Sequence, residues 1–247
     1  MNPRVLRARH AYQYLDLRNR EGAPVRGNRE FALLSTIMSH AVRWGVIDDT
    51  PFHEIIRNPE QPRDRLVTDD ELAVFVKYCP RWLQLYVALK LATGLRQTGM
   101  LKLSNKDWDD EKGLKVQASK TGSRLQFEAV DHLSFIISEL KQINGYRTTR
   151  KHRTPLLHWY FFASSANARK EQALTPDGFR TAWNKAMRAA IESGELQPEQ
   201  RFQDRDLRAK TASECETITQ AFELLGHSSV ATTKRVYRRG YTNLHKD

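Results

Sequence analysis

A short polar segment divides the sequence and constrains the fold more than any other feature. Residues 58–65 have the sequence NPEQPRDR, which contains two prolines and no large apolar side chain. Proline fixes φ and lacks a backbone N–H, so such a segment is typical of a linker and not of a helix or a strand. We therefore predict two domains, one over residues 1–62 and one over residues 66–247. Taken together, these residues are numerous enough to bury sizeable cores.

The first domain is expected to be helical. Asn28 is placed to cap a helix that Gly45 ends, because asparagine favours the position before the first turn and glycine the position after the last. A weaker amphipathic stretch precedes this helix at residues Ala11–Leu17. The apolar side chains of the longer helix fall on one stripe, which predicts its buried face: Phe31, Leu34, Ile37, Met38, Ala41 and Val42.

The second domain is expected to be mostly helical, beginning with two helices in succession. Thr68 and Glu71 form a capping box that opens a helix ending near Pro80. An apolar helix over Trp82–Ala92 follows, and Gly94 ends it.

One small antiparallel sheet is predicted after these helices. Apolar and polar side chains alternate around residues 114–118 and 124–130, and residues 119–123 supply a turn between them. The pattern indicates a β-hairpin. The expected fold class of the whole chain is therefore mainly α with a small antiparallel β-sheet (α+β).

Helices are expected again in the last third of the chain. Thr175 and Pro176 have the sequence of a helix start, and Gly194 ends that helix. Two short helices, over residues 218–225 and 230–237, are separated by a glycine. The buried face of the longer helix is predicted to consist of six side chains: Phe179, Trp183, Ala186, Met187, Ala190 and Ile191.

The composition favours a basic protein that binds a polyanion. The chain has 40 Lys and Arg against 29 Asp and Glu, a formal net charge of +11, which indicates nucleic acid as the simplest partner. Two cysteines are too few for a disulfide framework or a four-ligand zinc site. We expect no metal and no cofactor. No apolar stretch approaches the roughly 20 residues of a membrane span, and we expect a cytoplasmic protein.

Three clusters of residues have the chemistry needed to cut DNA without a metal. Such a reaction needs a nucleophile, cations around the phosphate oxygens and an acid for the leaving oxygen. TGLR at residues 93–96 and RDLR at residues 205–208 supply cations. LGH at residues 225–227 precedes Tyr237, a possible nucleophile among basic side chains, by ten residues. Spacing alone leaves open whether these clusters meet in space.

Four motifs occur in order along the second domain. They are LATGLRQTGMLKL around Arg96, a KTG turn at Lys120, FQDRDLRAKTAS around Arg208, and LLGHSSVATTKRVY with His227 and Tyr237. In this order and at these spacings they resemble the motifs of the tyrosine recombinase, or phage integrase, family. The resemblance implies a site-specific DNA recombinase and a role for each of these residues.

The implied mechanism needs neither metal nor ATP. Tyr237 would attack the scissile phosphate and form a 3′-phosphotyrosine, while Arg96 and Arg208 would hold the non-bridging oxygens. Lys120 would protonate the leaving 5′ oxygen. His227 would hydrogen-bond the phosphate and help take the tyrosine proton.

The resemblance also implies the domain roles and the partners. It covers about residues 66–243 as the catalytic domain, and NREFALLSTIMSHAVRWGVI within residues 1–60 resembles the helical core-binding domain of the family. The implied partners are double-stranded DNA attachment sites, a homotetramer on two duplexes, and accessory DNA-bending or excision factors.

Three departures from the family pattern leave alternatives open. Arg205 replaces the histidine of the second motif, and Gly99 replaces the acid that usually follows the first arginine. The core-binding domain is short, and an N-terminal arm-binding domain is either naturally absent or truncated. The alternatives are a catalytically impaired prophage remnant that binds DNA and, within the same chemistry, a type IB topoisomerase.

Overall fold

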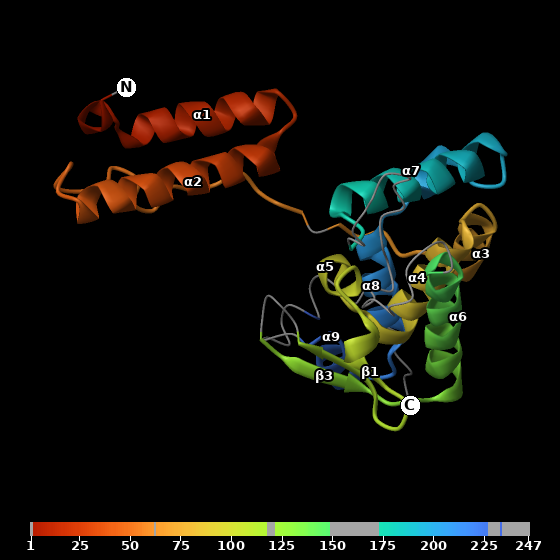
Figure 1. Ribbon diagram of the computed structural model, residues 1–247. Coiled ribbons are helices and arrows are strands. Elements are labelled where there is room, and N and C mark those ends of the chain that lie inside the picture. Colours follow the sequence, from red (N-terminus) through yellow and green to blue (C-terminus); the bar gives the residue numbers. More distant parts are fainter. Residues whose placement is uncertain (1, 62, 118–121, 149–172, 227–232, 234–247) are drawn as a thin grey trace, which may run out of the picture. The chain divides into compact units, whose positions relative to one another are not determined.

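The computed structural model divides into two compact units, Met1–Pro62 and Arg63–Asp247 (Figure 1). It describes residues 2–61, 63–117, 122–148, 173–226 and residue 233, with the backbone alone for residues 144–148. The described elements are mostly helices with one three-stranded antiparallel sheet. The fold class predicted from the sequence is confirmed.

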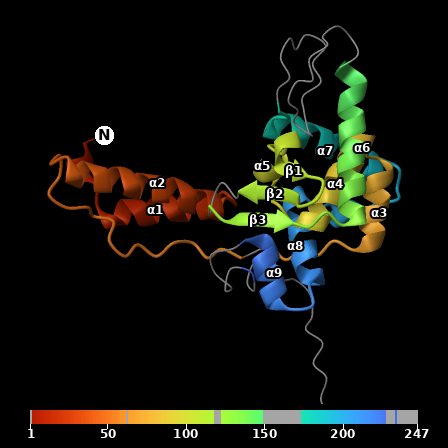
Figure 2. The ribbon, with the colours of Figure 1, turned by 60° about the horizontal axis from the view of Figure 1, so that its bottom comes forward.

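The N-terminal unit is a helical hairpin. A short 3-10 helix (Pro3–Val5) precedes α1 (Ala8–Arg20) and α2 (Pro24–Arg43), which lie side by side in Figures 1 and 2. The rings of Phe31 and Phe52 meet edge to face with centroids 5.4 Å apart. The core consists of seven buried side chains: Ala11, Leu15, Phe31, Met38, Ala41, Ile47 and Phe52.

The start of α2 corrects one prediction. The helix begins at Pro24, whose fixed φ suits the first turn, so Asn28 lies inside the helix and not at its cap. The buried Asn28 amide donates to the carbonyl oxygen of Asn58 (2.8 Å) and to a carboxylate oxygen of Glu60 (2.9 Å). Asn28 therefore fastens the chain after the hairpin to α2. The predicted apolar stripe is also too wide, because Ile37 is 53% exposed.

The second unit contains the sheet and the remaining helices. The helices are α3 (Asp69–Lys77), α4 (Arg81–Thr93), α5 (Gln97–Met100), α6 (Asp131–Thr148), α7 (Pro176–Glu192), α8 (Asp204–Glu214) and α9 (Ile218–Leu225). The strands are β1 (Trp108–Asp109), β2 (Gly113–Gln117) and β3 (Arg124–Phe127), in the order β1-β2-β3. Short 3-10 helices cover Asn105–Asp107 and Pro198–Gln200.

Local sequence signals placed most of these elements correctly. The capping box of Thr68 and Glu71 opens α3, Thr175 caps α7, and Gly94 ends α4 in the left-handed conformation. The predicted hairpin is β2 and β3, with Val116 opposite Leu125. The helix predicted over residues 230–237 lies outside the described residues.

Several elements were not predicted: the short 3-10 helices, α5, β1, α6 and α8. β1 has only two residues, α5 has only four, and α8 has the polar sequence DRDLRAKTASE. α6 does have apolar residues at helical spacing, Leu133, Ile136, Ile137 and Leu140, and the prediction did not use this pattern. Although polar, α8 is largely buried. Its charged side chains therefore require partners on other elements, which the periodicity of apolar residues does not reveal.

An aromatic cluster forms the centre of the second unit. The ring of Phe75 on α3 lies 4.5 Å from that of Trp183 on α7 and 5.1 Å from that of Phe202, which precedes α8. Phe179 packs against Tyr86 of α4 at 4.5 Å. These contacts fix α3, α4, α7 and the start of α8 against one another. Among the described residues, no helix is long and apolar enough to cross a membrane.

Replacing Phe75 tests this core. Phe75 is fully buried, so Phe75→Ala should lower the free energy of unfolding by about 3–5 kcal/mol through lost burial and a cavity. Phe135 on α6 is 56% exposed, and Phe135→Ala should change it by less than about 0.5 kcal/mol. Urea denaturation measures both, and equal losses would show that the cluster is not the core.

Candidate functional site

Arg208 joins the ends of two helices. Its side chain lies on α8 and is only 3% exposed. The guanidinium donates to the carbonyl oxygen of Gly94, which ends α4, and to that of Leu225, the last residue of α9, at 2.7 Å. The first and third motifs of the sequence, which contain these two glycine turns, therefore meet at the arginine of the second motif.

The two helix ends also touch directly. Gly94 has φ of 59°, and a Cβ atom there would lie 2.8 Å from Cδ2 of Leu225. Only glycine combines this backbone conformation with so close an approach. The contact places Gly94, two residues before Arg96, against the side chain of Leu225, which stands two residues before His227 in the sequence.

The hairpin reaches the same place. Gly226 ends α9, and a Cβ atom there would lie 3.2 Å from Cδ1 of Leu125 on β3. The hydroxyl of Ser123 donates to the carbonyl oxygen of Gly226 at 3.4 Å. In Figure 2, α9 lies beside α8 and below β3 of the hairpin. The first, second and third motifs thus meet through described residues, and Ser123, which follows the KTG turn in the sequence, contacts the third.

The predicted site residues differ in how the structure places them. Arg208 is buried, Arg96 is half-buried just before α5, and Arg205 is exposed on the first turn of α8. Within the described part of the chain, the side chains of Arg96 and Arg205 make no hydrogen bond or ion pair. Lys120, His227 and Tyr237 lie outside the described residues.

A buried charged group beside these arginines escaped the sequence analysis. Lys90 of α4 is 1% exposed, and its ammonium donates to Oδ2 of Asp204 at 2.9 Å. The hydroxyl of Tyr86 donates to Oδ1 of Asp204 at 2.8 Å. One feature of the sequence could have indicated this buried pair. It is the single lysine in the apolar run of α4, because lysine is rarely buried without a partner.

The electrostatics of this group link it to the site. Burial lowers the pKa of Lys90, the Asp204 carboxylate raises it, and the positive charges of Arg208 and Arg96 lower it, with a net shift downward. Burial, together with Asp204, raises the pKa of Tyr86 well above its usual value. The lysine therefore lies within electrostatic reach of both arginines.

The second acid of α8 has its own partner. Asp206 is fully buried, and Nε of Arg63 donates to both of its carboxylate oxygens, at 2.9 and 3.0 Å. Asp204 and Asp206 flank Arg205 in the sequence, yet each pairs with a cation from a distant segment. This pairing leaves Arg205 exposed between two engaged carboxylates.

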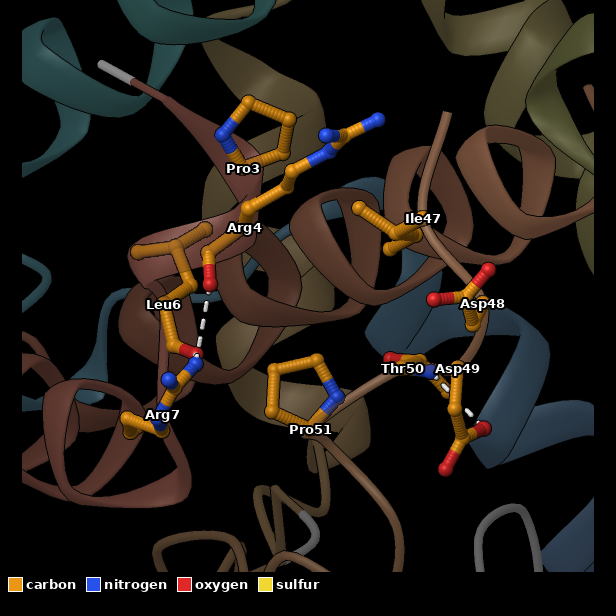
Figure 3. Close-up of a pocket in the computed structure, with 9 residues that line it drawn as sticks. All are labelled: Pro3, Arg4, Leu6, Arg7, Ile47, Asp48, Asp49, Thr50 and Pro51. Carbon is orange, nitrogen blue, oxygen red and sulfur yellow. Dashed lines mark hydrogen bonds between the residues drawn. The ribbon is translucent and has the colours of Figure 1, made fainter. Parts of the chain in front are cut away.

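Two pockets differ in their charge. One, of about 450 Å³, borders the site; three arginines (Arg180, Arg201 and Arg205) and two aspartates (Asp177 and Asp204) are among the residues that line it, together with Gln97. The other, of about 460 Å³, lies in the N-terminal unit (Figure 3).

The N-terminal pocket is lined by positive and negative side chains in equal number. Arg4 and Arg7 line it together with Asp48 and Asp49, and Arg7 also donates to the carbonyl oxygen of Arg4 at 2.9 Å. A lining of mixed charge does not favour the binding of an anion in this pocket. The described residues also contain no group of three His, Cys, Asp or Glu side chains that could hold a metal ion.

Comparison with known proteins identifies the fold. No protein-family model matches the chain, and no curated protein matches it. Among solved structures, a dimer of lambda integrase residues 75–356 bound to a COC′ core site superposes with a TM-score of 0.74 and 20% identity, over 100% of this chain and 86% of that one. The chain has the tyrosine recombinase fold.

Two further structures with the tyrosine recombinase fold are also similar. A lambda integrase tetramer bound to a Holliday junction gives a TM-score of 0.71 at 20% identity, over 98% of this chain and 68% of that one. The integrase of transposon Tn1549, in complex with a circular intermediate DNA, gives 0.71 at 13% identity, over 97% and 82%. The similarity thus extends over both units of the chain.

Two glycines of the first motif provide a matched test of the helix contact. Gly94→Ala should lower the free energy of unfolding by about 1–3 kcal/mol, because alanine is strained at this φ and would press on Leu225. Gly99→Ala should leave it unchanged or raise it by at most about 1 kcal/mol, since Gly99 is helical and open space surrounds it. Thermal and urea unfolding measure both. If both variants were as stable as the wild type, α4 and α9 would not meet at Gly94.

Proposed function

We propose that the chain is a site-specific DNA recombinase, which cuts and rejoins DNA through a 3′-phosphotyrosine on Tyr237 without metal or ATP. The observation that carries the proposal is the bridge from Arg208 to the carbonyl oxygens of Gly94 and Leu225. The bridge draws together the motifs that contain Arg96 and His227. Residues 1–62 would be the core-binding domain and residues 66–247 the catalytic domain.

Arg96 and Arg208 are suited to hold a phosphate from two sides. A guanidinium has five N–H donors in a planar fork, so one that fixes two carbonyl oxygens can also donate to a phosphate oxygen. Arg96 has no acidic partner among the residues that the structure describes, which favours an anion from outside. Charge that develops on the phosphate in the transition state would meet cations already in place.

The proposed reaction balances without a cofactor. The hydroxyl oxygen of Tyr237 forms a bond to phosphorus as the bond to the 5′ oxygen breaks, and Lys120 supplies the proton of the 5′ hydroxyl. His227 accepts the tyrosine proton. Arg205 contributes a donor and a positive charge only, because an arginine does not lose its proton near neutral pH. A 5′ hydroxyl of a partner duplex then reverses the steps and reseals the strand.

The proposed partners are DNA and further copies of the chain. The net charge of +11 suits a duplex, and such binding weakens as salt rises. The similar integrases were solved as a dimer on a core site and a tetramer on a Holliday junction. We extend this assembly to the present chain as four copies on two duplexes, assisted by accessory DNA-bending or excision factors.

A trapping assay tests the proposal. The full chain is incubated with nicked duplexes that carry candidate attachment sequences from the flanks of its gene, and a denaturing gel resolves covalent protein–DNA adducts. The wild type should form an adduct, and Tyr237→Phe should form none while it binds DNA normally in a native gel. Arg96→Ala should lower the cleavage rate about 100-fold or more, because it removes charge aimed at the transition state.

Tyr241→Phe is the matched control, since Tyr241 is the nearest other tyrosine and should be dispensable. An adduct that persisted in Tyr237→Phe would overturn the assignment of the nucleophile. Wild-type binding without any adduct would favour the impaired remnant. Relaxation of supercoiled DNA that lacks an attachment site would favour the topoisomerase.

A further inference from the structure

We propose that Lys90 is a positioning residue, which holds the Asp204 carboxylate away from the site arginines so that Arg96 and Arg205 stay available to a DNA phosphate. This inference rests on the proposed function. Lys90 would not touch the DNA, and its effect would pass through Asp204.

The geometry of the pair supports this role. Lys90 is almost completely buried on α4, and its ammonium lies 2.9 Å from Oδ2 of Asp204, whose side chain is 13% exposed at the start of α8. Removing two charges from water is costly, and well-packed apolar side chains often replace a buried ion pair without loss of stability. A contribution to folding stability alone therefore does not explain well why this ion pair is buried here.

The groups that surround Asp204 explain better why Lys90 is paired with it. Asp204 precedes Arg205 in the chain, and both line the pocket of about 450 Å³ that also includes Gln97, the neighbour of Arg96. Lys90 itself lies close enough to Arg96 for that charge to lower the pKa of the lysine. A carboxylate released by Lys90 would thus lie beside cations that the reaction needs, and it would attract them in place of a phosphate.

Asp206, the acid on the other side of Arg205 in the sequence, is also held by a cation. Asp206 is held by Arg63, as Asp204 is held by Lys90, so neither carboxylate is left to pair with Arg205 between them. Asp204 is the better test of the two, because it lines the pocket and Asp206 is fully buried.

Single-turnover cleavage of a nicked attachment-site duplex tests the inference in the full chain. Lys90→Met should lower the rate constant at saturating protein about 10- to 100-fold, as expected for a misplaced catalytic group, with DNA affinity and final adduct amplitude unchanged. Lys90→Met combined with Asp204→Asn should return the rate constant to within about 3-fold of wild type, because the competing carboxylate is gone. Asp204→Asn alone should also stay within about 3-fold.

Tyr86→Phe is the matched control. It removes the other hydrogen bond to Asp204 but keeps the ion pair, so the rate constant should change by less than about 3-fold. If Lys90→Met does not fold, Lys90→Gln provides a donor without the charge and should show the same loss and the same rescue. Melting curves ensure that every variant is assayed in its folded state.

The outcomes separate the inference from the proposed function. A wild type that forms no adduct contradicts the proposed function. If the wild type forms an adduct, the inference is overturned by Lys90→Met cleaving at the wild-type rate, by a loss of amplitude without a loss of rate, or by failure of Asp204→Asn to restore the rate. A purely structural role for Lys90 would lower the active fraction and leave the rate constant of the folded molecules intact.

Discussion

The arrangement of the second unit depends on one buried guanidinium placed between two helix ends. The last carbonyl groups of a helix have no partner within it and carry partial negative charge. Arg208 donates to such groups at the ends of both α4 and α9. Two helix ends that would otherwise be unsatisfied in the interior are thereby joined through one cation, which holds Gly94 and Leu225 close together.

A polar helix at the centre of the unit makes this possible. Asp204 pairs with Lys90, Asp206 with Arg63, and Lys210 with Asp69 at 2.6 Å, so successive acids and bases of α8 connect it to different segments. Each pair compensates for the cost of burying a charge. Arg205, on the same helix, is exposed and has no such partner within the described residues. The exposed Glu214 is bound by Lys210, so Arg205 is the charge of α8 that is exposed and has no ion-pair partner within the described residues.

The sequence predicted what depends on neighbours in the chain. The capping box at Thr68, the proline start of α7, the left-handed Gly94 and the β2–β3 hairpin each have a local signature, and the structure confirms them. The prediction of Asn28 as a cap was wrong because α2 begins earlier, at Pro24, and the side chain of Asn28 instead bonds Asn58, which is 30 residues away.

The site was predictable in its residue types but not in its contacts. The partners of Arg208 are backbone carbonyl oxygens, which every residue has, so no side-chain pattern indicates them. Lys90 and Asp204 are 114 residues apart, and only the packing of α4 on α8 brings them together. Motif order therefore pointed to the arginines, and three-dimensional packing was needed to find the charges that position them.

A crystal structure of the Tyr237→Phe variant on a nicked attachment-site duplex tests the central claim most directly. We expect the oxygens of one phosphate to lie within about 3 Å of the guanidinium groups of both Arg96 and Arg208, while Arg208 keeps its bonds to Gly94 and Leu225. A duplex bound with no phosphate near these two arginines would contradict the account.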